Sequence, residues 1–192
     1  MDRRGDSAAV AIVKTLSMAA LAAASVAALS GCAAPDTAPA PAIPARLVVP
    51  ATQELSLKTK AVGVQIYECA ADRDDATHFE WVFRAPEATL LDAKGNRVGV
   101  HYAGPTWEAN DGSKVLGEVK ARDDGPDATA IPWLLLAAKS ATGKGPLART
   151  TSVQRILTVG GKAPGDGCGP AQAGREIRVP YEAAYYFYAA AR

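Results

Sequence analysis

The stretch His78-Phe-Glu-Trp-Val-Phe-Arg84 decides the fold class of this 192-residue chain. Its aromatic residues recur at every second position, and polar residues occupy most of the places between them. Successive side chains of a β-strand point to opposite faces, so this alternation places Phe79, Trp81 and Phe83 together on one face. The stretch therefore predicts a strand with one aromatic and one mainly polar face.

Similar segments follow one another along the chain, each bounded by Gly, Pro, Asn or Asp. The turn sequence Lys94-Gly-Asn96, for example, predicts a hairpin. We expect strands at residues 54–58, 63–69, 78–84, 88–92, 97–102, 114–122, 131–139, 149–159, 176–179 and 184–188. About ten short strands without a three-turn amphipathic helix predict an all-β fold, either an antiparallel sandwich or a barrel.

Residues 1–31 have the composition of an export signal. Arg3 and Arg4 supply positive charge, and residues 15–29 form an uncharged run rich in Ala, Leu and Val. The run ends in Leu29-Ser-Gly-Cys32, which resembles the lipobox of bacterial lipoproteins. We therefore expect a signal peptide over residues 1–31 and a lipid on Cys32.

A lipid on Cys32 would make the membrane a partner of the protein. Ala33 follows the cysteine, and the absence of Asp at this place favours the outer membrane, with the domain facing the periplasm. The alternative is ordinary secretion after cleavage near Ala34. Replacing Cys32 by Ser distinguishes the two, because only a lipoprotein would be released from the membrane by that change.

The exported part divides into two regions. Residues 32–50 are rich in Ala and Pro, a composition that favours an extended tether. Residues 51–192 have the length of a single β-rich domain. The chain contains 21 basic and 20 acidic residues, so it lacks the basic surface that nucleic-acid binding requires.

Two cysteines remain in the domain, Cys69 and Cys168. An exported protein meets an oxidising compartment, so a disulfide between them is the expected pairing. The alternative is a metal-binding or redox pair, but no CxxC spacing and no neighbouring histidine supports it.

Several short motifs together are similar to one protein family. They are Gly63-Val-Gln-Ile-Tyr-Glu-Cys69, Trp81-Val-Phe83, Ala85-Pro-Glu-Ala88, His101-Tyr-Ala-Gly-Pro-Thr-Trp-Glu108, Asp111-Gly-Ser113, Ile131-Pro-Trp-Leu-Leu-Leu136, Val153-Gln-Arg155 and Val179-Pro-Tyr181. The set resembles the domain-of-unknown-function family 3455 of bacteria and fungi, over about residues 44–188. The resemblance implies an exported β-rich domain with no established activity. Some fungal members are labelled malate dehydrogenase, but this chain lacks the GxGxxG turn of such enzymes, and we expect no cofactor.

The segment from His101 to Ser113 is the best candidate for a binding or catalytic loop. Glu108 would serve as a base, His101 as an acid or ligand and Trp107 as an apolar wall, with Asp111 nearby. The alternative is a purely architectural hairpin loop in which Trp107 closes one end of the sheet. No metal site is expected, because the chain has only two histidines and no HxH or HExxH spacing.

Arg155 is the remaining candidate ligand-binding residue, because it lies inside an otherwise apolar strand. A guanidinium there either binds an anionic group or pairs internally with a carboxylate such as Glu68 or Glu118. We expect the internal pair, since a buried charge needs a counter-charge even without a ligand.

These observations favour a non-catalytic module that binds a small molecule or another envelope protein. An enzyme with a site around His101, Trp107 and Glu108 is the first alternative, and a structural envelope protein is the second. A deep pocket at those three residues would favour the enzyme, whereas a flat aromatic patch near Tyr186 and Tyr188 would favour a protein partner.

Overall fold

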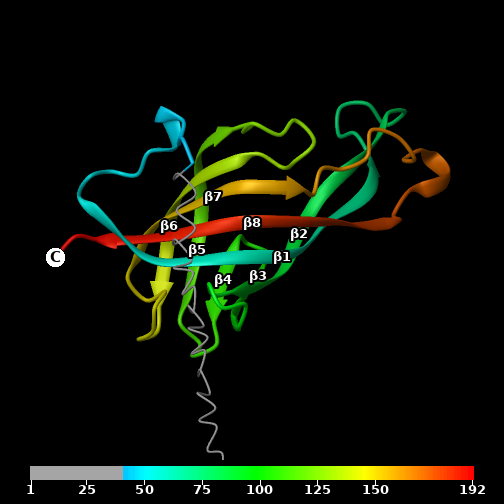
Figure 1. Cartoon of the computed structure of the whole chain (residues 1–192). Coiled ribbons are helices and arrows are strands. Elements are labelled where there is room, and N and C mark those ends of the chain that lie inside the picture. Colours follow the sequence, from blue (N-terminus) through cyan, green and yellow to red (C-terminus); the bar gives the residue numbers. More distant parts are fainter. Residues whose placement is uncertain (1–40) are drawn as a thin grey trace, which may run out of the picture. The chain divides into compact units, whose positions relative to one another are not determined.

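A computed structural model describes residues 41–192, so the predicted signal peptide and Cys32 lie outside the described residues. Nearly all regular structure in this part is strand, which confirms the all-β prediction (Figure 1). The strands are β1 (Gln53–Ala71), β2 (Phe79–Leu91), β3 (Arg97–Tyr102), β4 (Thr106–Ala109), β5 (Lys114–Asp123), β6 (Trp133–Thr142), β7 (Thr150–Gly160) and β8 (Glu176–Ala190). Two short 3-10 helices, η1 (Ala45–Leu47) and η2 (Pro170–Gln172), accompany them.

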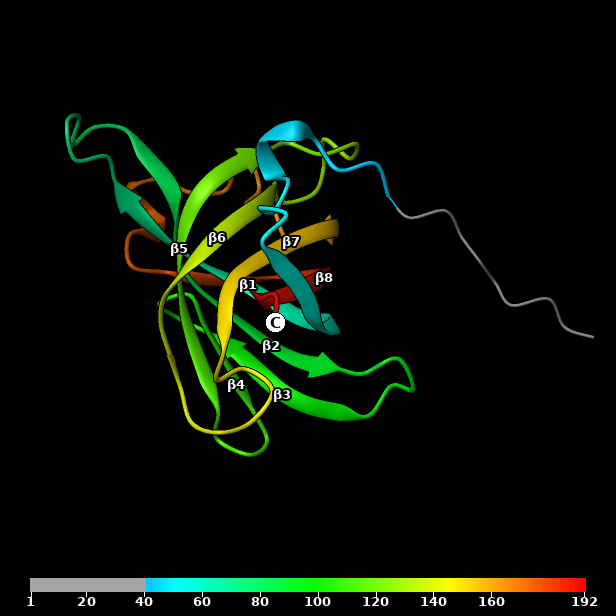
Figure 2. The same cartoon turned by 90° about the vertical axis from the view of Figure 1, so that its left-hand side faces the viewer.

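The eight strands form one closed antiparallel barrel in which each strand pairs with its neighbours in sequence. The barrel closes between β1 and β8, which run side by side over most of their length (Figure 1), with Gly63 opposite Tyr181. Of the two predicted architectures, the barrel is therefore the one observed. Figure 2 shows the barrel turned by 90°, with β5, β6 and β7 following one another around the wall to β8.

The prediction of about ten short strands is wrong in its count, because three pairs of predicted segments are continuous. Residues 54–58 and 63–69 both belong to β1, and β2 and β8 each unite two more predicted segments. Gly63 and Pro86 had suggested strand ends. Instead, a Cβ on Gly63 would lie 2.1 Å from the Glu87 carbonyl oxygen, so glycine permits the close approach of β2 at this place.

The structure also contains a strand within a segment that was expected to be a loop. The expected loop from His101 to Ser113 is wrong in its middle, because Trp107 and Glu108 lie in β4, whereas His101 lies in β3 within the predicted strand 97–102. Strand β4 is short, and its one alternation of apolar and polar residues is too brief to be recognised without its partners. Its pairing with β3 on one side and β5 on the other defines it.

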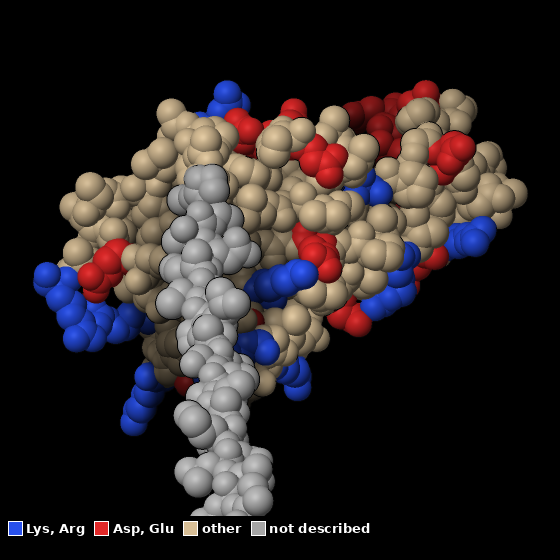
Figure 3. All heavy atoms as spheres, in the orientation of Figure 1, with Lys and Arg blue, Asp and Glu red and all other residues tan. Residues whose placement is uncertain are grey.

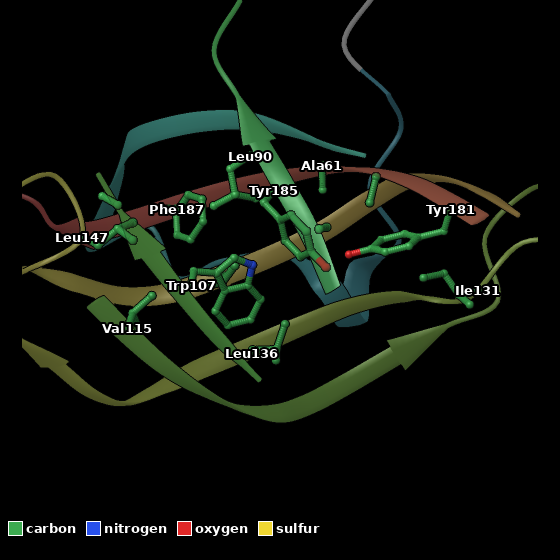
Figure 4. Packing of buried hydrophobic residues seen from close by; sticks show 14 residues of the cluster. Ala61, Leu90, Trp107, Val115, Ile131, Leu136, Leu147, Tyr181, Tyr185 and Phe187 are labelled. Carbon is green, nitrogen blue, oxygen red and sulfur yellow. The ribbon is translucent and has the colours of Figure 1, made fainter. Parts of the chain in front are cut away.

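The core occupies the interior of the barrel (Figure 4). Its largest fully buried side chains are Trp107 and, from the last strand, Tyr185 and Phe187. Gly117 on β5 makes room for the indole, since a Cβ there would lie 2.9 Å from Cζ3 of Trp107. The last strand thus contributes one aromatic face to the core, whereas Tyr186 packs on the outer side of the barrel.

A second, smaller apolar cluster lies on the outer side of the barrel, where η1 contacts β5 and β6 (Figure 2). Leu47 of η1 is fully buried there against Trp133 and Ile156. The Leu47 carbonyl oxygen also accepts a hydrogen bond of 2.6 Å from Nε2 of Gln154. Residues 45–47, which were expected to belong to the tether, are therefore part of the folded unit.

The disulfide between Cys69 and Cys168 is present, as the sequence predicts, with 5.4 Å between the two Cα atoms. It joins the end of β1 to the loop that carries η2. Backbone hydrogen bonds reinforce this junction: the Cys69 N–H donates to Arg175, and the Gly174 N–H donates to Cys69. The disulfide thus holds the loop that carries η2 against the end of β1.

Charged side chains of both signs are spread over the face of the protein seen in Figure 3, in keeping with the near-neutral composition. In residues 41–192, no helix is long and apolar enough to cross a membrane.

Candidate functional site

A cavity of about 650 Å³ opens into one end of the barrel. Aliphatic and aromatic side chains form most of its wall, and they come from strands that are distant in sequence. Tyr67 (β1), Trp107 (β4), Leu136 (β6) and Tyr185 (β8) are buried parts of this wall. The cavity is therefore a product of barrel closure, which brings these strands around one space.

The inner wall of the cavity contains a stacked pair of rings, His101 and Trp107. Their centroids are 4.5 Å apart and their planes are inclined by only 8°. Nδ1 of His101 lies 2.8 Å from the Thr106 carbonyl oxygen, which can only accept, so Nδ1 carries the proton. Burial, reinforced by the positive charge of Arg155, lowers the pKa of His101 to about 3, although the Thr106 hydrogen bond opposes this shift. His101 is consequently neutral near pH 7.

Several polar groups at or beside the cavity are buried without a hydrogen-bond partner in the described part of the chain. They are Nε2 of Gln65, Nε1 of Trp107 and the hydroxyl groups of Tyr181 and Tyr185. Figure 4 shows the two tyrosine hydroxyls pointing toward one another, and burial raises the pKa of both. A buried donor without a partner costs free energy, so these groups are suited to meet water or a polar atom of a ligand.

Arg155 extends from β7 into the same cavity. Its Nε and Nη2 atoms donate hydrogen bonds of 3.1 and 2.9 Å to the Pro132 carbonyl oxygen, which holds the half-buried guanidinium in place. No carboxylate within residues 41–192 forms an ion pair with it.

The predicted internal ion pair of Arg155 with Glu68 or Glu118 is therefore wrong. Glu68 pairs with Arg84 at 2.9 Å, and Glu118 pairs with Lys120 at 2.7 Å. Both carboxylates have a nearer basic partner on their own or an adjacent strand, so neither has to reach the interior of the barrel.

The charged lining of the cavity is entirely basic. Arg84, Arg122, Arg155 and Lys162 all line it, and no Asp or Glu does. Of these, Arg84 is neutralised by Glu68, and Nζ of Lys162 donates to the Ala128 carbonyl oxygen. An apolar space with several basic groups and no acidic one favours a neutral or anionic occupant over a cationic one.

The mouth of the cavity is marked by exposed apolar side chains. Phe83 and Val119 both line the cavity, yet 49% and 50% of their surfaces remain accessible to solvent. Large apolar groups exposed at the entrance of a concave site are typical of surfaces that a ligand covers.

Two predicted site residues lie away from the cavity. Glu108 follows Trp107 on β4, so its side chain is on the outer face. There it accepts a hydrogen bond of 2.7 Å from the Tyr102 hydroxyl and forms an ion pair with Lys114 at 3.0 Å. Asp111 accepts the Ser113 N–H at 2.8 Å in the next turn. The structure thus brings together only His101, Trp107 and Arg155 of the predicted set. In residues 41–192, no three His, Cys, Asp or Glu side chains are grouped as a metal site requires.

The sequence of residues 50–189 matches the profile of the family described as "Protein of unknown function (DUF3455)". The chain belongs to this family. The match spans β1 to β8, and thus every strand that encloses the cavity. Comparison with curated proteins yields no match, and neither does comparison with solved structures.

Other members of the cavity wall in this DUF3455 domain were not recognised from the sequence. Gln65 is the clearest case, since it is only 2% exposed. Along β1 it alternates in step with Ala61 and Tyr67, so it occupies an inward position of the strand. A polar residue at an inward position of a strand could have indicated a site. Gln65 can be recognised as such a residue only when the ends and the inward face of β1 are known.

Proposed function

We propose that this domain binds one small, largely apolar molecule inside its barrel. The observation that carries the proposal is the cavity of about 650 Å³ with apolar walls and a few polar groups directed into it. An eight-stranded barrel either fills its interior with side chains or holds one small ligand. Here the core fills part of the interior, and the remaining volume is within the range of small-molecule sites.

The arrangement favours binding over acid–base catalysis. His101 is neutral and already bonded through Nδ1, while Glu108 lies on the opposite side of the barrel wall. A general acid and base must both reach the reacting atoms, and these two side chains face different spaces. The cavity therefore lacks the pair of groups that the enzyme alternative required.

We further propose that the domain acts in the bacterial envelope, anchored to the outer membrane by lipid on Cys32. Support comes from the sequence Leu29-Ser-Gly-Cys32 and from the disulfide, since disulfides persist in exported proteins. The test is fractionation of cells that produce the wild-type protein or the Cys32→Ser variant. Release of the variant to the soluble fraction supports the anchor, and its retention in the membrane contradicts it.

Binding can be tested on the full chain carrying Cys32→Ser with the neutral fluorescent probe N-phenyl-1-naphthylamine, whose emission rises in apolar surroundings. We expect saturable binding of one probe per chain. Val119→Trp should abolish it, because Val119 lies at the mouth and a larger side chain there obstructs entry.

The matched control is Val62→Trp. Val62 is 40% exposed and does not line the cavity, so this variant should bind the probe as the wild type does. Urea denaturation of both variants shows whether each is folded. Absence of saturable binding to the wild type, or equal binding by a folded Val119→Trp protein, would contradict the proposal.

A further inference from the structure

We infer that the ligand carries a carboxylate and that Arg155 receives it. This inference rests on the proposed function, because it specifies the chemistry of the molecule in the same cavity. The following observations concern the position of the guanidinium, its unused donors and the groups around it.

Strand pairing directs Arg155 to the interior. In the pairing of β6 with β7, Leu134 is opposite Arg155, and in the pairing of β7 with β8, Arg155 is opposite Tyr185. Leu134 is also opposite Arg122 of β5. Directly opposed residues in a sheet share a face. Because Tyr185 is buried in the core, Arg155 lies on the inward row with it.

The guanidinium is held but not neutralised. Its two hydrogen bonds to the Pro132 carbonyl oxygen use the N–H groups of Nε and Nη2, and a guanidinium has five N–H donors in all. The remaining donors have no carboxylate partner among residues 41–192. A half-buried positive charge without a counter-ion is unfavourable, and an anionic group entering the cavity would relieve that cost.

The surroundings favour a carboxylate attached to an apolar body. Aromatic and aliphatic groups form the rest of the wall, including Tyr67, Trp107 and Leu136. A planar carboxylate matches the fork of an arginine and can form two parallel hydrogen bonds with it. The hydroxyl of Tyr185, the cross-strand neighbour of Arg155, has no partner and is suited to donate a further hydrogen bond.

Arg122 and Lys162 are the competing basic groups at the cavity. Both are exposed, and Lys162 already donates to the Ala128 carbonyl oxygen. Charges in contact with water are screened and lose little when left unpaired. Arg155 is the least exposed of the basic residues that line the cavity, so its interaction with an anion is the strongest of the set.

The experiment compares 2-naphthoic acid with 2-naphthalenemethanol, which have the same ring system and differ in the carboxylate. Each competes with N-phenyl-1-naphthylamine on the full chain carrying Cys32→Ser, at pH 7. We expect the acid to bind about tenfold to a hundredfold more tightly than the alcohol, as a charge-assisted hydrogen bond provides. Arg155→Met should remove this preference while leaving the affinity for the neutral probe nearly unchanged.

Two further variants keep the test decisive. Arg155→Lys keeps the positive charge but lacks the planar guanidinium, so it should keep part of the preference for the acid. It replaces Arg155→Met in the test if that variant is poorly folded. Arg178→Gln removes a basic group that pairs with Glu87 at 2.7 Å and does not line the cavity, and should leave the preference intact.

Each outcome has a distinct meaning. Failure of the neutral probe to bind the wild type would contradict the proposed function itself. Binding of that probe with equal affinities for acid and alcohol would overturn the carboxylate inference alone. A preference that survives Arg155→Met but is lost in Arg122→Gln would overturn the role of Arg155.

Discussion

His101 and Trp107 form a stacked pair across β3 and β4, with ring centroids 4.5 Å apart and both side chains almost completely buried. The two residues are directly opposite in register, and both side chains point inward. A histidine in this position stays neutral in the folded protein but takes up a proton when the chain unfolds. Stability must therefore depend on pH.

The first prediction concerns this dependence. The pKa of His101 is about 3 in the folded state and about 6.5 in the unfolded state, so between these values the unfolded chain binds more protons. Stability therefore falls as the pH falls below 6.5, by about 2 kcal/mol between pH 7.5 and pH 5. Urea denaturation at several pH values measures it.

The matched variants for that measurement are His101→Phe and His78→Gln, since the chain has only these two histidines. His101→Phe should flatten the dependence above pH 5. His78→Gln should preserve it, because His78 is exposed. An equal slope in wild type and His101→Phe would contradict the assignment.

The second prediction concerns Leu47, which anchors η1 to the outer side of the barrel. Leu47→Ala should reduce the free energy of unfolding by about 2–5 kcal/mol, the usual cost of emptying a buried leucine site. Its neighbour Val48 is 57% exposed, and Val48→Ala should change stability by no more than about 0.5 kcal/mol. Equal effects of the two changes in urea denaturation would place η1 outside the folded unit.

The third prediction concerns the disulfide, whose cysteines are 99 positions apart. Replacing both Cys69 and Cys168 by Ala should lower stability by about 4–5 kcal/mol, according to the chain-entropy account of loop closure. Thermal denaturation of the Cys32→Ser protein, with and without reductant, gives the same comparison without mutation at the bridge. A midpoint unaffected by reductant and by the double change would show that the bridge contributes little.

The fourth prediction concerns Leu157, which has a φ of 51° where the register of β7 shifts against β8. A branched residue in the left-handed region is strained, whereas Asn adopts it readily. Leu157→Asn should therefore raise the free energy of unfolding by about 0.5–1 kcal/mol, since Leu157 is 47% exposed and loses little packing. Leu55→Asn is the control at an exposed position without positive φ, and should not stabilise the protein. Destabilisation by Leu157→Asn would contradict the strain.

The predicted strands show why local patterns succeed for some elements and fail for others. The alternation in residues 78–84 is visible without any partner, because side-chain direction in a strand has a period of two. The continuity of β1 through Gly63 cannot be seen in the local sequence, because this glycine permits the close approach of β2 and does not form a turn. Strand β4 was not predicted for a similar reason, because it is defined by its pairing with β3 and β5 and not by its own sequence pattern.

The residues of the candidate site also differ in whether the sequence alone identifies them. His101, Trp107 and Arg155 were recognisable as unusual residues, and the structure places all three at one cavity. Glu108 was grouped with them because it is close in sequence, yet adjacent residues of a strand face opposite sides. Gln65 and Tyr67 are distant in sequence from the others, and only the pairing of strands adds them to the wall.

The sequence by itself determined the all-β class, the pairing of the two cysteines in residues 51–192 and the near-neutral charge, because these follow from local alternation, residue count and composition. The tertiary structure alone decided that the strands close into a barrel and which side chains face the cavity. Closure and register depend on hydrogen bonds between residues far apart in the chain, and a shift of one residue would exchange every inward side chain for an outward one.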